Sequence, residues 1–70
     1  MNGRVSDAAV LEWIRLYVSR KGYAPTVREV ARGVGLVSTS TAFYHINKLV
    51  KQGHITRDPG IARSIVVVAA

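Results

Sequence analysis

Several kinds of residue are scarce in this 70-residue sequence. It contains no cysteine, two prolines, one tryptophan and only four acidic residues. Because cysteine is absent, no disulfide and no thiolate metal site can form, and packing of apolar side chains must stabilise the fold. A chain of this length forms one domain at most and lies near the lower limit for folding on a hydrophobic core alone. We therefore predict a single domain over residues 1–70.

Long apolar runs are also missing. No stretch approaches the roughly 20 apolar residues of a membrane-spanning helix, and the N-terminal segment MNGRVSDAA lacks the apolar region of a signal peptide. The simplest expectation is a cytoplasmic protein with no membrane partner. His45 and His54 have no carboxylate between them, so their spacing yields no metal-ligand cluster. We predict no metal, no cofactor and no small-molecule ligand.

The groups that catalysis requires are not assembled in this sequence. The acidic residues are scattered, and each has a structural explanation: Asp7 at a helix dipole, Glu12 on a helix surface, Glu29 in a capping box and Asp58 in a turn. As a catalytic pair, His45 and His54 are expected to have no orienting acid nearby. The segment 33–35, Gly-Val-Gly, lacks the lysine and the spacing of a nucleotide-binding loop. We therefore predict that the protein is not an enzyme.

Positive charge, in contrast, is abundant. Ten Lys and Arg residues against four acidic residues give a formal net charge of +6. No acidic residue lies between Glu29 and Asp58, whereas Lys48, Lys51 and Arg57 all do. A basic stretch without acids favours a polyanionic partner, because its cations neutralise phosphates and release counterions. The alternative from charge alone is a solvated basic face that has no partner.

The first half of the chain begins with a helical pattern. Residues 1–5 are expected to be a short flexible start, and a helix is predicted over about 7–21. Its apolar residues recur at helical spacing and form one core face: Val10, Leu11, Ile14, Tyr17 and Val18. Ser6 is placed to cap this helix, and Gly22 can adopt the left-handed conformation that ends it. Leu16 lies off the core face and is expected either to be a lone exposed leucine or to contact a second subunit.

Two further helices are predicted over about 27–34 and 39–52. The second begins at a capping box, in which Thr26 and Glu29 exchange hydrogen bonds, and Ser38 is placed to cap the third. The core faces of these two helices are Val27, Val30, Ala31 and Val34, followed by Ala42, Ile46, Leu49 and Val50. A short glycine-containing turn separates the two helices, which is the layout of a helix-turn-helix.

After the third helix the hydrophobic period changes from helical to alternating. A strand pattern at 54–57, a turn cluster at 58–60 and a second strand rich in β-branched residues predict a β-hairpin, or wing, over about 54–68. Its core face is expected to hold Ile55, Ile65 and Val67, whereas Val66 and Val68 point outward. The predicted fold class is therefore mainly α with a small β-hairpin (α+β), a three-helix winged helix-turn-helix.

This layout suits double-stranded DNA, because a helix with a short, polar first turn can enter the major groove. The residues expected to contact bases are Ser40, Thr41, Phe43, Tyr44 and Asn47. The residues expected to contact phosphates are Thr26, Arg28, Ser38, Thr39, Lys48, Lys51, Arg57 and Arg63. Some of these have a structural alternative. Ser38 serves first as a helix cap, Phe43 lies close enough to the core face to be half-buried, and Arg63 can pair with Asp58 across the hairpin.

An ordered set of motifs resembles the N-terminal DNA-binding domain of the LexA-type repressors of the SOS response. The motifs are GYAPTVREV at 22–30, VGLVSTST at 34–41, His45-Ile46 with Leu49, Lys51-Gln52-Gly53, and Arg57-Asp58-Pro59 with Arg63. The resemblance implies a winged fold that binds palindromic operators as a dimer and represses transcription, with bases contacted by the early part of the third helix. The matching positions are Ser38, Ser40, Thr41, Phe43 and Tyr44.

The sequence departs from this family in two respects. The aromatic side chains of Phe43 and Tyr44 replace the polar residues that the family carries at these positions. The family's second domain, which contains a Ser/Lys dyad for self-cleavage and dimerises the repressor, has no counterpart in this sequence, so no self-cleavage is expected. Two alternatives stay open: a winged-helix module that binds another protein, and a recombination-directing or architectural factor of a mobile element.

Overall fold

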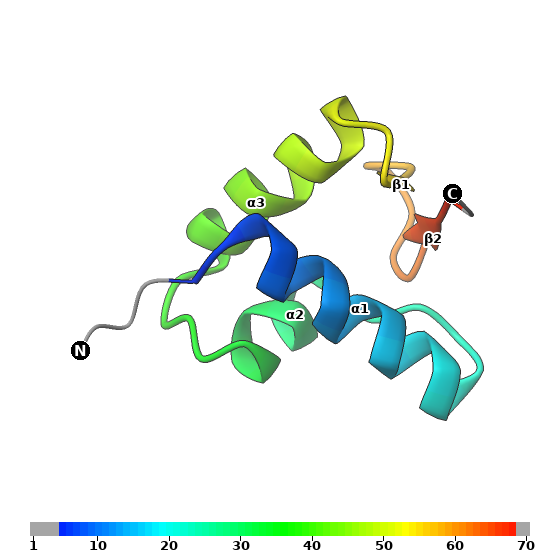
Figure 1. The fold of residues 1–70 in the computed structure, drawn as a ribbon, viewed down its shortest axis with the longest axis horizontal. Coiled ribbons are helices and arrows are strands. Elements are labelled where there is room, and N and C mark those ends of the chain that lie inside the picture. Colours follow the sequence, from blue (N-terminus) through cyan, green and yellow to red (C-terminus); the bar gives the residue numbers. More distant parts are fainter. Residues whose placement is uncertain (1–4, 69–70) are drawn as a thin grey trace.

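The computed structural model describes residues 5–68. These form three helices and a two-stranded antiparallel hairpin (Figure 1). The elements are α1 (Asp7–Lys21), α2 (Val27–Gly33), α3 (Thr39–Lys51), β1 (Ile55–Thr56) and β2 (Val66–Val67). The predicted class, mainly α with a small wing, is confirmed. The predicted flexible start at residues 1–5 lies outside the described residues except for Val5, whose side chain is half-buried against the core.

Helix α1 begins and ends at the residues that the sequence indicates. The Ser6 hydroxyl accepts a hydrogen bond from the backbone N–H of Ala9 at 3.1 Å. At the other end, Gly22 has a φ of 79°, and its N–H donates to the carbonyl of Val18 at 2.9 Å. Glycine adopts this left-handed conformation without the steric cost of a Cβ atom. Leu16 is exposed, as expected.

The capping box of α2 is formed in both directions. Thr26 Oγ1 accepts from the N–H of Glu29 at 3.1 Å, and the Glu29 carboxylate accepts from the N–H of Thr26 at 2.9 Å. At the end of α2, Gly33 packs directly beneath the indole of Trp13. A Cβ atom on Gly33 would lie 2.6 Å from Trp13 Nε1 and closer still to the adjacent ring carbons. Helices α1 and α2 can therefore approach each other this closely only with a glycine at this position.

One hydrophobic core connects the helices and the wing. Its buried apolar residues are Val10, Ile14, Val30, Ala31, Ala42, Ile46, Leu49, Ile55 and Ile65. Val50, predicted to belong to this core, is 37% exposed. Consecutive helical residues lie about 100° apart, so Val50 falls to one side of the narrow stripe that Ala42, Ile46 and Leu49 occupy. The prediction for Val50 was wrong because this stripe is narrower than expected.

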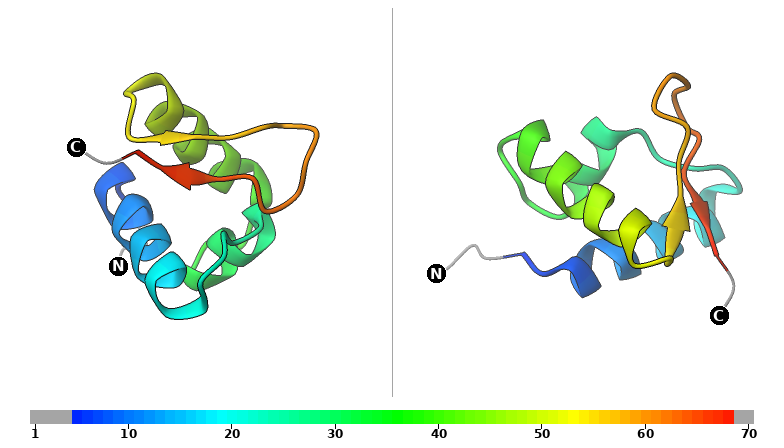
Figure 2. Two further views of the ribbon diagram at one scale, coloured as in Figure 1. Left: turned by 90° about the vertical axis from the view of Figure 1, so that its right-hand side faces the viewer. Right: turned by 90° about the horizontal axis from the view of Figure 1, so that it is seen from above.

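The wing is a short ladder with a long loop. Ile55 pairs with Val67 and Thr56 with Val66, and the N–H of Val68 donates to the carbonyl of His54 at 2.9 Å. Figure 2 shows the two strands side by side, joined by a loop that extends beyond them. Val66 and Val68 are exposed as predicted.

The second strand of the wing is shorter than the sequence pattern indicates. Arg63 adopts a φ of 57°, which is incompatible with an extended strand. Within the loop, the Ser64 hydroxyl accepts from the N–H of Asp58 at 3.0 Å and donates to its carbonyl at 2.8 Å. Local hydrogen bonds therefore replace strand pairing in this segment.

Within residues 5–68, no helix is both long enough and apolar enough to cross a membrane.

Candidate nucleic-acid interface

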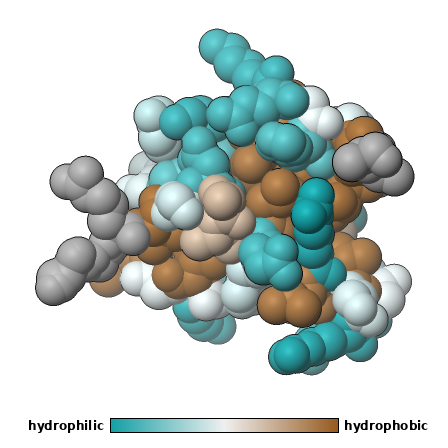
Figure 3. All heavy atoms as spheres, viewed as in Figure 1, coloured by the Kyte–Doolittle hydropathy of each residue, from teal (hydrophilic) through white to brown (hydrophobic). Residues whose placement is uncertain are grey.

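The exposed arc of α3 carries the side chains that were predicted to contact bases. Ser40, Thr41, Phe43, Tyr44 and Asn47 are all exposed. The helix starts sharply, because the Ser38 hydroxyl accepts from the N–H of Ser40 at 3.1 Å. In Figure 3, hydrophilic side chains gather along the upper edge of the molecule, where α3 lies. Because Ala42, Ile46 and Leu49 face the core, the opposite face of α3, which carries polar and aromatic side chains, is exposed to solvent.

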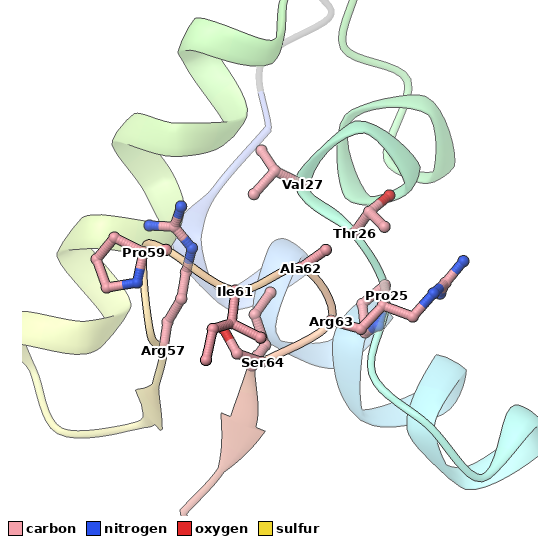
Figure 4. Close-up of a pocket in the computed structure, with 11 residues that line it drawn as sticks. Pro25, Thr26, Val27, Arg57, Pro59, Ile61, Ala62, Arg63 and Ser64 are labelled. Carbon is pink, nitrogen blue, oxygen red and sulfur yellow. The ribbon is translucent and has the colours of Figure 1, made fainter.

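Phe43 connects this arc to the wing. The residue is 38% exposed, and the guanidinium carbon of Arg57 lies 4.8 Å from the centroid of the Phe43 ring. Figure 4 shows Arg57 leaving the wing towards α3, whereas Arg63 points the opposite way, towards the connector between α1 and α2. A cation over an aromatic face is attracted by the negative charge of the ring's π system. Arg57 is therefore held beside α3, next to the exposed arc.

Tyr44 is the most exposed aromatic side chain of this arc, at 59%. Lys48, one helical turn further along, places its Nζ 5.4 Å from the Tyr44 ring centroid. The His45 ring meets the Tyr44 ring edge to face, with 5.5 Å between centroids. The Tyr44 ring therefore has polar neighbours on two sides and a large free surface.

An acidic residue of α1 reaches this face of α3. Asp7 Oδ1 lies 2.6 Å from His45 Nδ1, and Asp7 Oδ2 lies 3.0 Å from Lys48 Nζ. These contacts with His45 and Lys48 lower the pKa of the Asp7 carboxyl, and the carboxylate in turn raises the pKa of Lys48. The expectation that His45 has no acid nearby was wrong, because folding brings together residues 38 positions apart.

The second basic residue of the wing, Arg63, is bound by the helices. Its guanidinium donates to both carboxylate oxygens of Glu29, at 2.9 and 3.1 Å, and to the carbonyl of Ala24 at 3.0 Å. The predicted alternative, a pair with Asp58, is wrong; the Asp58 carboxylate instead accepts from the N–H of Gly60. The Arg63 guanidinium, with the Thr26 N–H, lowers the pKa of Glu29 to about 2.

The other residues predicted to contact phosphates fall into two groups. Thr26 and Ser38 are half-buried, and their hydroxyls are used as helix caps. Arg28, Thr39 and Lys51 are exposed, and among residues 5–68 no carboxylate forms a salt bridge with Arg28, Lys51 or Arg57. The cations that flank α3 therefore differ in availability: Lys48 and Arg63 are paired with acids, whereas the other three are not.

Sequence reasoning did not identify Asp7 and Glu29 as partners of these cations. It assigned Asp7 to the helix dipole and Glu29 to the capping box, and both local roles are compatible with the structure. No local pattern indicates the second role, since Glu29 and Arg63 are 34 positions apart.

A helix-turn-helix with an exposed polar helix, followed by a hairpin packed on the same core, defines the winged helix-turn-helix class. The family model described as the LexA DNA binding domain matches residues 6–64. The chain belongs to this family.

Curated relatives agree with the family match. The LexA repressor of Limosilactobacillus fermentum is 44% identical over 99% of this chain and 33% of its own length. The LexA repressor of Caldicellulosiruptor saccharolyticus is 46% identical, and that of Bacillus mycoides is 44% identical, each over 84% of this chain and 29% of its own length. The chain therefore spans about a third of the length of these relatives.

Proposed function

We propose that this protein binds double-stranded DNA in a sequence-specific manner and represses transcription by occupying an operator. The observation that carries the proposal is the exposed arc of α3, which presents hydroxyl, amide and aromatic groups between flanking cations. Its family membership and the name of its relatives, LexA repressor, support this function. On this view the protein acts by binding and not by catalysis.

The proposed base contacts follow from side-chain chemistry. Ser40 and Thr41 have hydroxyls that can donate or accept, and the Asn47 amide matches the hydrogen-bonding edge of adenine. The exposed ring of Tyr44 suits apolar contact with a thymine methyl group, and Phe43 can offer its free edge to the same groove. Because these two aromatic residues replace polar ones, we propose that the operator differs from that of the LexA-type repressors.

The proposed phosphate contacts depend first on Arg28, Lys51 and Arg57, the cations that no carboxylate neutralises among the described residues. Each phosphate neutralised on duplex DNA adds about −0.9 to the slope of log K against log salt concentration. Three such contacts predict a slope of about −2.7 per protomer, whereas all five predicted cations would give about −4.5.

We further propose that two copies bind a palindromic site. A single winged module buries only about 600–1,000 Å² against DNA, which limits its specificity. Exposed Val66 on β2 and exposed Val68 just after it give a second copy an apolar strand edge to contact. Sedimentation of the protein with its selected duplex tests this point, and a single copy on a palindromic site would contradict it.

The experiment that tests DNA binding is selection of bound sites from random duplexes, followed by fluorescence anisotropy at several salt concentrations. Lys51→Ala should reduce the magnitude of the salt slope by about 0.9. Lys21→Ala is a matched control, since each lysine lies in the last turn of a helix but Lys21 belongs to α1. Tyr44→Ala should weaken specific binding by about 1–3 kcal/mol and relax the selected sequence. Salt-independent binding, or no enrichment of any sequence, would contradict the proposal.

A further inference from the structure

Asp7, in the first turn of α1, contacts α3 beside its exposed arc through its carboxylate. Both oxygens of Asp7 are used: Oδ1 lies 2.6 Å from His45 Nδ1 and Oδ2 lies 3.0 Å from Lys48 Nζ. The Asp7 side chain is only 21% exposed, and that of His45 is 12% exposed. This carboxylate is therefore enclosed by α3, although a role at the helix dipole alone would leave it in solvent.

The position of Lys48 follows from this contact. Its ammonium group lies between the Asp7 carboxylate and the face of the Tyr44 ring, 5.4 Å from the ring centroid. A cation that is already neutralised by a carboxylate releases fewer counterions when a phosphate approaches, and the carboxylate itself repels the phosphate. Lys48 in this position contributes less to DNA affinity than its charge alone implies.

Another acidic residue of the same helix shows that this arrangement is particular to Asp7. Glu12 is exposed on α1, and no salt bridge among residues 5–68 involves it. Substitution of either acid by its amide changes the net charge of the protein by the same amount. Only the change at Asp7 alters a contact with α3.

We infer that Asp7 is a positioning residue that limits DNA affinity by holding Lys48 away from the phosphates. The inference rests on the proposed DNA binding and assigns Asp7 a role in it. Release of Lys48 should add one phosphate contact per protomer. The salt slope of a variant without this carboxylate should then steepen by about 0.9.

The test compares Asp7→Asn, Glu12→Gln, Lys48→Ala and the double variant Asp7→Asn/Lys48→Ala by anisotropy over a salt series on the selected duplex. Asp7→Asn should bind about two- to five-fold more tightly than the unmodified protein, as expected for release of a surface ion pair, with the steeper slope. Glu12→Gln should give a smaller gain and an unchanged slope. In the Lys48→Ala background, the Asp7 substitution should no longer change the slope.

The outcomes separate this inference from the proposed function. A protein that shows no salt-dependent, sequence-selective DNA binding refutes the proposed function and this inference with it. A protein that binds DNA while Asp7→Asn and Glu12→Gln behave alike refutes the inference alone. The inference alone is also refuted if Asp7→Asn still steepens the salt slope in the Lys48→Ala background. Circular dichroism establishes that each variant is folded, and Asp7→Ser, which also removes the carboxylate, replaces Asp7→Asn if Asp7→Asn does not fold.

Discussion

Gly33 lies at the end of α2, with its Cα atom against the indole of Trp13, and this contact makes Gly33→Ala informative. Helix propensity favours the alanine by roughly 0.5–1 kcal/mol. The structure predicts the opposite, because the new Cβ atom would lie 2.6 Å from Trp13 Nε1 and closer to two ring carbons. Trp13 stacks on Tyr17 with 5.1 Å between ring centroids, so its indole cannot move without disturbing a second ring.

The magnitude follows from these two opposing effects. Insertion of a methyl group into a well-packed site costs about 1–3 kcal/mol, which exceeds the propensity gain. We expect a net loss of about 1–2 kcal/mol, which for a domain of this size lowers Tm by about 5–15 °C. Thermal unfolding followed by circular dichroism measures this change. Fluorescence reports the displaced indole directly, since Trp13 is the only tryptophan of the sequence.

Two further variants make the Gly33 result decisive. A Cβ atom on Gly60 would meet only Asp58 Oδ1, at 3.7 Å. Gly60→Ala should therefore leave the free energy of unfolding unchanged or increase it by up to about 1 kcal/mol, and Tm should not fall. In a Trp13→Leu background the ring is gone, and Gly33→Ala should no longer destabilise. An unchanged or higher Tm for Gly33→Ala, with unaltered tryptophan emission, would show that the contact between α1 and α2 tolerates a Cβ atom at this position.

Three other predictions concern the ion pair, the core and the wing. The pKa of Glu29, about 2 in the fold, lies below its ordinary value of 4.5. The contribution of Glu29 to stability is therefore complete above about pH 4.5 and is lost as the pH falls towards 2. Glu29→Gln cannot titrate and should flatten the fall of Tm over this pH range, whereas parallel curves of Tm against pH for the two proteins would contradict this prediction. Leu49→Ala, at a side chain 1% exposed, should cost about 2–5 kcal/mol in urea unfolding, and a loss below 1 kcal/mol would show that the site collapses. Phe43→Leu keeps an apolar side chain but removes the face beneath Arg57, so it should weaken DNA binding without lowering Tm, and unchanged affinity would mean that Arg57 does not depend on the ring.

Features that depend on neighbouring residues could be predicted from the sequence. A short local motif indicates where each helix begins, because a capping side chain accepts a hydrogen bond from an N–H only two or three residues away. The caps at Ser6, Thr26 and Ser38 are all formed as expected. The change from helical to alternating period after α3 likewise predicted the wing, since the two periodicities place apolar side chains on different faces.

Features that depend on how the elements pack could not be predicted in this way. The contact between Trp13 and Gly33 is set by the distance between α1 and α2, and no periodicity reports an interhelical distance. Val50 shows the same limit, since whether a residue at the edge of a stripe is buried depends on the neighbouring element and not on its own helix. The left-handed conformation of Arg63 was equally unexpected, because non-glycine residues rarely adopt it.

The effect of the four acidic residues depends on which cations they contact and not only on their number. Composition counts cations but does not say which are neutralised, and a net charge of +6 would be the same whichever cations the acids contact. In the fold, Glu29 forms a salt bridge with Arg63 of the wing and joins the wing to the helices. Asp7 instead forms a salt bridge with Lys48 beside the exposed arc of α3. On the proposed function, the Glu29–Arg63 pair makes one cation unavailable to DNA while it joins the wing to the helices, and the Asp7–Lys48 pair weakens binding at the face of α3 that would read bases. Under this proposal, two of the four acids determine how many cations are available to DNA, and sequence-specific contacts must supply the affinity that these two ion pairs remove.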